Sequence, residues 1–170
     1  MKKIYFKLSK ILILPLYYFN HRIYMFFYNS ILKTVGVKLN GTPRYIGYNV
    51  KFDNFSKIII GNRCVISDEC HLLTHDYSLT TAMISINKKP KTDIAFVRQI
   101  EIGNNVFIGK KSIIMPGAKI GDNVIIGAGA VVRGKVPSNS IFIGNPAIKI
   151  SDLDKKAVVW SNIETNIKKD

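Results

Sequence analysis

Acidic side chains are missing from the first 52 residues of this sequence, and the first Asp or Glu is Asp53. Over all 170 residues, 25 Lys and Arg stand against 11 Asp and Glu, which gives a formal net charge of +14. Such an excess favours anionic partners, namely nucleic acid, anionic lipid or phosphorylated ligands. No helix-turn-helix, zinc-finger or RNP-like motif accompanies the charge, so we expect no binding of nucleic acid.

Cysteine is also scarce, with only Cys64 and Cys70, which lie six positions apart. Both fall where the repeat described below places small residues that point inward. We therefore expect buried, reduced core thiols rather than a disulfide, a metal site or a nucleophile. Two reduced thiols are compatible with the cytoplasm.

Long hydrophobic runs are absent as well. The apolar runs Ile11–Phe19 and Ile23–Tyr28 are separated by polar residues, and both fall short of the roughly 18 residues that a membrane-spanning helix needs. No small-residue cleavage site of a signal peptide follows them. We therefore expect a cytoplasmic protein, either free or peripheral at the inner face of the cell membrane.

Residues 1–42 form a basic, aromatic and amphipathic segment that we expect to be helical. Two interpretations are open. Residues 1–33 contact a membrane surface, or the helices pack on the rest of the chain or on a neighbouring subunit and cover its open end.

A period of six dominates the stretch Ile102–Val132. Each block of six opens with an aliphatic residue and carries a compact residue in its fifth place. The openers are Ile102, Ile108, Ile114, Ile120, Ile126 and Val132, and the fifth residues are Val106, Ser112, Ala118, Val124 and Ala130. A helix repeats apolar positions every 3.6 residues and a strand every 2, so a period of six indicates a short strand followed by a turn.

Three such units can close one coil of a prism. The opener then points inward and the small fifth residue fills a corner. Gly or Asn takes the turn, where a positive φ costs little. Pro116-Gly117 suits a type II turn.

The repeat also extends toward the N-terminus. It starts weakly with blocks that open at Ile46 and Phe52, and it resumes clearly at Ile60, Ile66 and Leu72. It then stops. The segment Lys88–Lys91 cannot face a core, so we expect residues 78–99 to leave the prism as a loop.

The chain is accordingly divided into three parts. We expect the amphipathic helical segment at 1–42, a β-helix at 43–150 that includes the loop 78–99, and a C-terminal helix with a polar tail at 151–170. The two end segments are candidate caps, because exposed strand edges invite aggregation.

The pattern resembles the hexapeptide-repeat acyltransferases, which include galactoside, maltose and streptogramin acetyltransferases and many capsule or lipopolysaccharide O-acetyltransferases. The resemblance covers about Ile46 to Lys149. It implies an all-β fold, a left-handed parallel β-helix with one protruding loop, an N-terminal helical segment and a short C-terminal helix. It also implies a homotrimer, an active site between two subunits and acetyl-CoA as the donor substrate, with no metal required.

The resemblance points to His75 as the catalytic residue. This histidine stands at the fourth position of the last regular block before the loop, and the family's catalytic histidine has a similar place. It serves there as a general base for the acceptor hydroxyl or amine, a role that typically contributes about 10²–10⁴-fold to the rate. No histidine follows His75, so the three-histidine zinc site of the related γ-class carbonic anhydrases cannot be assembled.

On the donor side, Asn105–Lys110 matches a family motif. The resemblance implies that the backbone amide of Lys110 stabilises the tetrahedral intermediate. Phe107 matches the motif's aromatic residue, which walls the site, and Gly109 belongs to the same acetyl-CoA-binding motif.

The resemblance assigns the rest of the site with less detail. Gly127 and Ala128 match positions along the pantetheine arm of CoA. Arg133 and Lys149 match positions near the adenosine phosphates; the alternative for these two residues is a generic basic surface. Asp53 and Asn54 are the nearest matches to acceptor-side residues, although extra residues before Ile60 blur the register.

The expected function is acetyl transfer from acetyl-CoA to a sugar hydroxyl, in the assembly of a cell-surface polysaccharide. The acceptor would be a glycan or a nucleotide- or lipid-linked sugar. Two alternatives stay open: N-acetylation of an amino sugar nucleotide, and a non-catalytic β-helix scaffold at a membrane surface.

Overall fold

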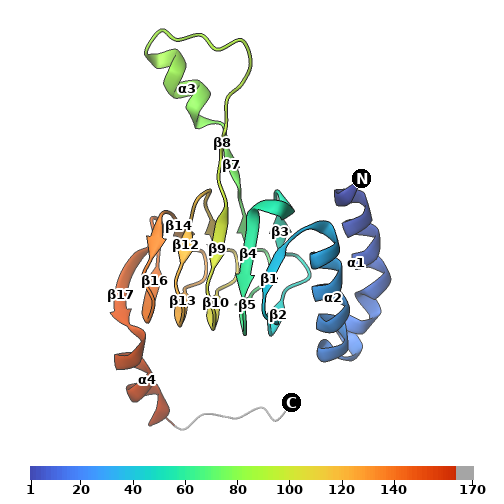
Figure 1. Ribbon diagram of the computed structural model, residues 1–170. Coiled ribbons are helices and arrows are strands. Elements are labelled where there is room, and N and C mark those ends of the chain that lie inside the picture. Colours follow the sequence, from blue (N-terminus) through green and yellow to red (C-terminus); the bar gives the residue numbers. More distant parts are fainter. Residues whose placement is uncertain (164–170) are drawn as a thin grey trace.

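Short parallel strands stack into three sheets, which confirms the coil predicted from the six-residue period (Figure 1). The computed structural model describes residues 1–163. In stacking order the first sheet holds β1 (Lys38–Asn40), β4 (Ile58–Gly61), β9 (Ile100–Ile102), β12 (Lys119–Ile120) and β15 (Lys135–Val136). The second holds β2 (Tyr45–Ile46), β5 (Val65–Ile66), β10 (Val106–Ile108), β13 (Val124–Ile126) and β16 (Ser140–Ile143). The third holds β3 (Lys51–Phe52), β6 (His71–Leu72), β11 (Ile113–Ile114) and β14 (Val131–Val132).

The openers and fifth-position residues fill the inside of the prism, as the repeat predicts. Every opener from Ile102 to Val132 is at most 4% exposed, and the fifth-position residues are equally buried. Cys64 and Cys70 are free, fully buried thiols in the same position. Burial raises the pKa of the Cys70 thiol to about 11, so this sulfur stays protonated and inert at neutral pH.

Glycine serves the coils in two different ways. In the regular blocks from Ile102 to Ala130 the fourth residue adopts a positive φ, as at Asn105, Lys111 and Gly117. The second-position Gly109 does not. A Cβ on Gly109 would lie 2.5 Å from the backbone nitrogen of Ala128 in the next coil, so this glycine permits close stacking. The expectation that glycine marks the turn therefore holds for Gly117 and is wrong for Gly109.

The regular coil is interrupted once by a long excursion. β7 (His75–Asp76) pairs antiparallel with β8 (Phe96–Val97), and α3 (Ser78–Ser85) lies between them. Figure 1 shows this segment standing away from the prism, and none of the residues of α3 is buried. The predicted loop is thus a two-stranded stalk that carries a short helix.

Two helices cover the first coil at the N-terminal end of the prism. α1 (Lys2–Phe19) and α2 (His21–Val35) form a hairpin (Figure 1). The side chain of Asn20 accepts from the amides of Arg22 and Ile23, which caps α2 at its start. The inner face joins the core of the β-helix. Its buried residues include Phe6, Ile13, Tyr24, Tyr28 and Leu32.

The outer face of this hairpin is apolar and exposed. It carries Ile4, Leu8, Ile11, Leu12, Tyr18, Phe19, Phe26 and Phe27. Within residues 1–163 no helix is both long and apolar enough to cross a membrane. The packing interpretation therefore describes one face of the hairpin, while the side chains of the other face are exposed in the structure of residues 1–163.

At the opposite end, β17 (Ile148–Asp152) pairs antiparallel with β16, and α4 (Leu153–Ser161) follows. The predicted C-terminal helix is confirmed, and the expected polar tail at 164–170 lies outside the described residues. With four α-helices in the described chain, the expected all-β class is incomplete, because helices cover an end that strands alone would leave open.

Candidate active site

His75 lies where the chain turns off the third sheet. In the preceding coil Asp53 follows β3 at the same corner. Phe52 and Leu72 are paired in the third sheet, so the residues after them stack as well. This register brings Asp53 beside Thr74 and His75.

One carboxylate oxygen of Asp53 gathers three hydrogen bonds. Its Oδ2 accepts from the backbone nitrogen of Thr74 at 3.0 Å, from Thr74 Oγ1 at 2.7 Å, and makes a short contact with His75 Nδ1. Burial alone would raise the pKa of Asp53, but the bonds from Thr74 and His75 outweigh it and hold the pKa below its usual value. Asp53 is therefore ionised at neutral pH, and Nδ1 of His75 carries the proton that faces it.

A cavity of about 400 Å³ opens beside this cluster. Asp53, Asn54, Thr74 and His75 line one part of it, and Tyr77 stands edge-on to the His75 ring with 5.3 Å between ring centroids. The other walls come from the stalk and from the start of α1. They include Ala95, Val97, Lys2 and Lys3. The side chain of His75 is 42% exposed, so an acceptor can reach it.

Asn54 has a local role in this corner. Its Oδ1 accepts from the backbone nitrogen and the hydroxyl of Ser56, at 3.1 and 2.9 Å, and so shapes the turn after Asp53. Its own backbone nitrogen donates to Thr74 Oγ1 at 3.2 Å. Asp53 and Asn54 thus lie beside His75, and Asp53 also bonds to the imidazole; their acceptor-side role stays a prediction.

The residues expected on the acetyl-CoA side lie at another corner. Phe107 projects from β10 between Val65 and Ile125 on the outer face of the second sheet and is 41% exposed. Gly109 and Lys110 follow at the corner between the second and third sheets. Lys110 Nζ lies 3.4 Å from a Glu69 oxygen.

Gly127 and Ala128 occupy the same corner one coil later, where the amide of Gly129 donates to the Lys110 carbonyl at 2.8 Å. A Cβ built on Gly129 would have no neighbour within 4 Å, so the backbone beside Ala128 is open to a ligand. Small residues with accessible backbone therefore occupy this corner, and their contact with acetyl-CoA stays a prediction.

Arg133 and Lys149 lie on other parts of the coil, although Lys149 pairs with Phe142, whose carbonyl accepts from the amide of Gly127. Arg133 lies at the corner between the third and first sheets, and Lys149 on β17 pairs with Asp152 at 2.5 Å. None of the seven residues expected to bind acetyl-CoA lines the His75 cavity. Within the described chain, 1–163, no group of three or more His, Cys, Asp or Glu could hold a metal ion.

Sequence reasoning did not single out Thr74, Tyr77, Lys2 or Lys3. Thr74 and Tyr77 flank His75, so their proximity to the predicted base was a usable signal. The two lysines lie more than 70 positions away from His75, and only the packing of α1 against the first coil places them at the cavity.

Comparisons with known proteins agree with this fold. The family described as bacterial transferase hexapeptide (six repeats) matches residues 99–134. A putative acetyltransferase of Schizosaccharomyces pombe is 33% identical over 116 residues, which is 68% of this chain and 53% of that protein. A putative lipopolysaccharide biosynthesis O-acetyl transferase of Escherichia coli K12 is 26% identical over 138 residues, 74% of this chain and 70% of that protein.

A solved galactoside acetyltransferase in complex with coenzyme A shares the fold, with a TM-score of 0.57, 21% identity, and coverage of 96% of this chain and 86% of that chain. This chain spans about half the length of the fission-yeast relative. Its three parallel sheets fit a left-handed β-helix. On the repeat, the fold and these matches, the chain carries the hexapeptide repeat and is similar to hexapeptide-repeat acetyltransferases.

Proposed function

We propose that this protein is an acetyl-CoA-dependent O-acetyltransferase that acetylates a sugar hydroxyl, with His75 as the general base. The observation that supports this most is the bond between His75 Nδ1 and the ionised Asp53 at the mouth of a cavity. With Nδ1 protonated and facing the carboxylate, Nε2 is the basic nitrogen that can take a proton.

The chemistry follows from that arrangement. His75 Nε2 accepts the proton of the acceptor hydroxyl as its oxygen attacks the thioester carbonyl. The negative charge on the carbonyl oxygen of the tetrahedral intermediate is stabilised by a backbone donor, which we assign to the Lys110 amide. Collapse of the intermediate breaks the carbon–sulfur bond, and His75 returns the proton to the leaving sulfur. Asp53 stabilises the imidazolium that exists between these two transfers.

A complete site requires two copies of the chain. His75 lies at the corner between the third and first sheets, whereas Phe107, Lys110 and Ala128 lie on the second sheet or its border with the third. A neighbouring subunit can bring its own donor-side corner against the His75 cavity. We therefore propose a homotrimer with active sites between subunits, in which the stalk reaches toward the next protomer.

The acceptor is proposed to be a cell-surface glycan or its nucleotide- or lipid-linked precursor. Support comes from the lipopolysaccharide O-acetyl transferase relative and from the N-terminal hairpin. Its exposed apolar side chains, together with exposed basic residues such as Arg22 and Lys33, suit peripheral contact with an anionic membrane surface, where such precursors reside.

The test is release of CoA thiol from acetyl-CoA across a panel of sugar acceptors, measured for wild type, His75→Ala and the control His21→Ala. His21 lies on α2, away from the cavity. Wild type and the control should turn over equally, and His75→Ala should lose at least about 100-fold. Unchanged turnover in His75→Ala would refute the mechanism, and acceptors that carry only a free amine would reveal N-acetylation. Absence of any calorimetric heat with acetyl-CoA would favour a non-catalytic scaffold.

A further inference from the structure

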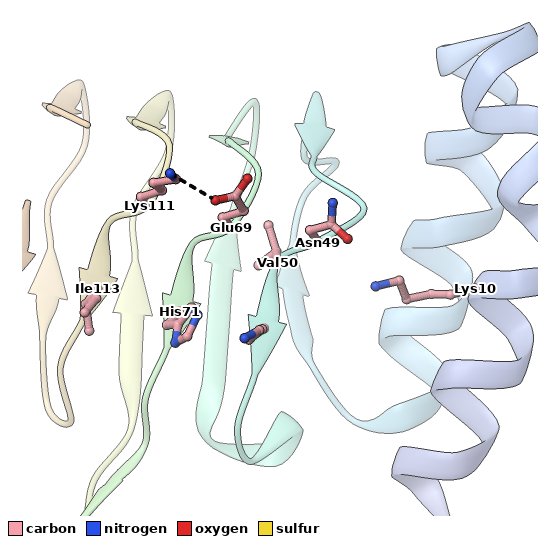
Figure 2. Close-up of a pocket in the computed structure, with 8 residues that line it drawn as sticks. Lys10, Asn49, Val50, Glu69, His71, Lys111 and Ile113 are labelled. Carbon is pink, nitrogen blue, oxygen red and sulfur yellow. Dashed lines mark ion pairs between the residues drawn. The ribbon is translucent and has the colours of Figure 1, made fainter. Parts of the chain in front are cut away.

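The His75 cavity is one end of a longer groove. A second cavity of about 530 Å³ shares Lys3 and Phe55 with it, and a third of about 680 Å³ shares Lys10, Val50 and Lys51 with the second. The three therefore run end to end between α1 and the outer face of the third sheet. Figure 2 shows the far end, where Lys10 of α1 points across the gap toward the strands.

Lysines follow this groove along its whole length. We call the groove with these side chains the lysine groove, and its lysines are Lys2, Lys3, Lys7, Lys10, Lys51 and Lys111. Of the carboxylates in the described part of the chain, 1–163, only two line the groove, and both already make hydrogen bonds or ion pairs. Asp53 is bonded to Thr74 and His75, and Glu69 pairs with Lys110 and Lys111 at 3.4 and 3.6 Å.

The remaining cations are available to a ligand. Among residues 1–163, neither Lys3, Lys7 nor Lys51 makes an ion pair. Lys7 is exposed on α1, and Lys51 is exposed on β3 at the facing wall. The middle of the groove thus presents positive charge from both sides.

Lys10 is fixed rather than free. Its Nζ donates to the Tyr48 carbonyl and lies 4.2 Å from the centroid of the Tyr48 ring. Burial lowers the pKa of Lys10, against a smaller opposite effect of Asp68. The protein therefore keeps an ammonium in a partly desolvated place, where attraction to an anion is less screened than at the open surface.

We propose that the lysine groove binds an anionic acceptor, whose phosphate or carboxylate groups lie along Lys3, Lys7, Lys10 and Lys51 while a sugar hydroxyl reaches His75. This inference rests on the proposed function and narrows its substrate class. Several separate ammonium groups along one path suit charges that are spread along a ligand. A neutral sugar would leave this row of ammonium groups without a counter-charge. The protein should therefore prefer a negatively charged acceptor over a neutral one.

The kinetic test compares three acceptors of matched size: a neutral hexose, the same hexose 1-phosphate and the corresponding hexuronate. In wild type the phosphate or the carboxylate acceptor should show a KM about tenfold below that of the hexose, and the better of the two identifies the anionic group. The kcat/KM of that acceptor should fall with added salt more steeply than that of the hexose.

Two double variants remove equal charge from different places. Lys7→Gln/Lys51→Gln removes two positive charges from the middle of the groove. It should reduce the tenfold preference for the anionic acceptor to about twofold. Lys135→Gln/Lys156→Gln lies on β15 and α4 at the opposite end of the prism and should retain the preference. Equal KM values for all three acceptors in wild type, or an equal loss in both double variants, would overturn the inference.

A binding measurement separates this inference from the proposed function. Inorganic tripolyphosphate is titrated calorimetrically into each protein at low salt. Wild type and the distal variant should bind it about tenfold more tightly than Lys7→Gln/Lys51→Gln. If no acceptor is acetylated, the proposed function fails, and this titration alone decides the groove: no binding, or equal binding in all three proteins, refutes it.

Discussion

Asp53→Asn should slow acetyl transfer without disturbing the fold. The three hydrogen bonds of Asp53 converge on one oxygen, Oδ2. An asparagine amide oxygen in that place still accepts from Thr74 and from protonated Nδ1 of His75. The substitution therefore keeps the geometry and the tautomer of the imidazole, and removes only the negative charge that stabilises the imidazolium.

The size of the effect follows from that charge. Two unit charges about 4 Å apart interact by about 4 kcal/mol at an effective dielectric constant of 20. The His75 side chain is 42% exposed, so solvent screens roughly half of this. A loss of about 2 kcal/mol corresponds to roughly 30-fold in kcat. Because the pKa of Asp53 is lowered, its carboxylate is ionised throughout the neutral pH range, so the charge that the substitution removes is fully present in wild type under the assay conditions.

The assay is steady-state thiol release, with kcat and the acceptor KM measured for wild type, Asp53→Asn, His75→Ala and the double variant. For Asp53→Asn we expect the roughly 30-fold loss in kcat and an acceptor KM within about threefold of wild type. Adding Asp53→Asn to His75→Ala should cause no further loss in kcat. A raised acceptor KM with unchanged kcat would mean that Asp53 contacts the acceptor instead of serving His75. If Asp53→Asn lowered kcat as much in the His75→Ala variant as in wild type, the proposed coupling of Asp53 to His75 would likewise be refuted.

Three further predictions concern stacking, assembly and the helical cap. Gly109→Ala should lower the free energy of unfolding by about 3 kcal/mol, because the added Cβ would meet the backbone of the next coil at 2.5 Å. Gly129→Ala should lower it by only about 1 kcal/mol, because the Cβ would have open space and the cost comes from a φ of 69°. Thermal melts measure both, and equal losses of stability would contradict the stacking role of Gly109. His75→Ala and Ala128→Trp chains should each be inactive alone. When the two are co-expressed in equal amounts and assemble at random, about a quarter of all sites should regain activity, and no recovery would argue against shared sites. The Tyr28 hydroxyl is buried without a hydrogen-bond partner among residues 1–163, so Tyr28→Phe should raise stability by about 1 kcal/mol, and a lowered melting temperature would reveal a hidden partner.

The architecture could be predicted because the repeat is local. An inward opener such as Ile108 and a small corner residue such as Ser112 recur at a fixed spacing, and each coil buries them in the same way. The same logic placed Cys64 and Cys70 correctly in the core. The role of Gly109 was not predictable from its own coil, since its constraint is the backbone of the coil stacked on it.

The site was predictable only in part, for a related reason. His75 was found from its place at the end of a block. Its contact with Asp53 depends on how many residues the first coil contains, and the short 3₁₀ helix Phe55–Lys57 had blurred that count. Lys3 lies at the cavity because the N-terminal hairpin folds back over the first coil, a packing that no local pattern encodes.

The two interruptions of the repeat share one corner, and this explains where the chemistry sits. In regular blocks the fourth residue adopts a positive φ and the coil continues, as at Glu69 and Lys111. His75 holds the same position but does not adopt a positive φ, because the chain departs there into the stalk. In the coil below, the chain departs from the period directly after Asp53. At each interruption one side chain, His75 or Asp53, lies outside the regular turn. Because the coils stack, the two side chains lie next to each other. The reactive pair therefore lies where the six-residue period is interrupted.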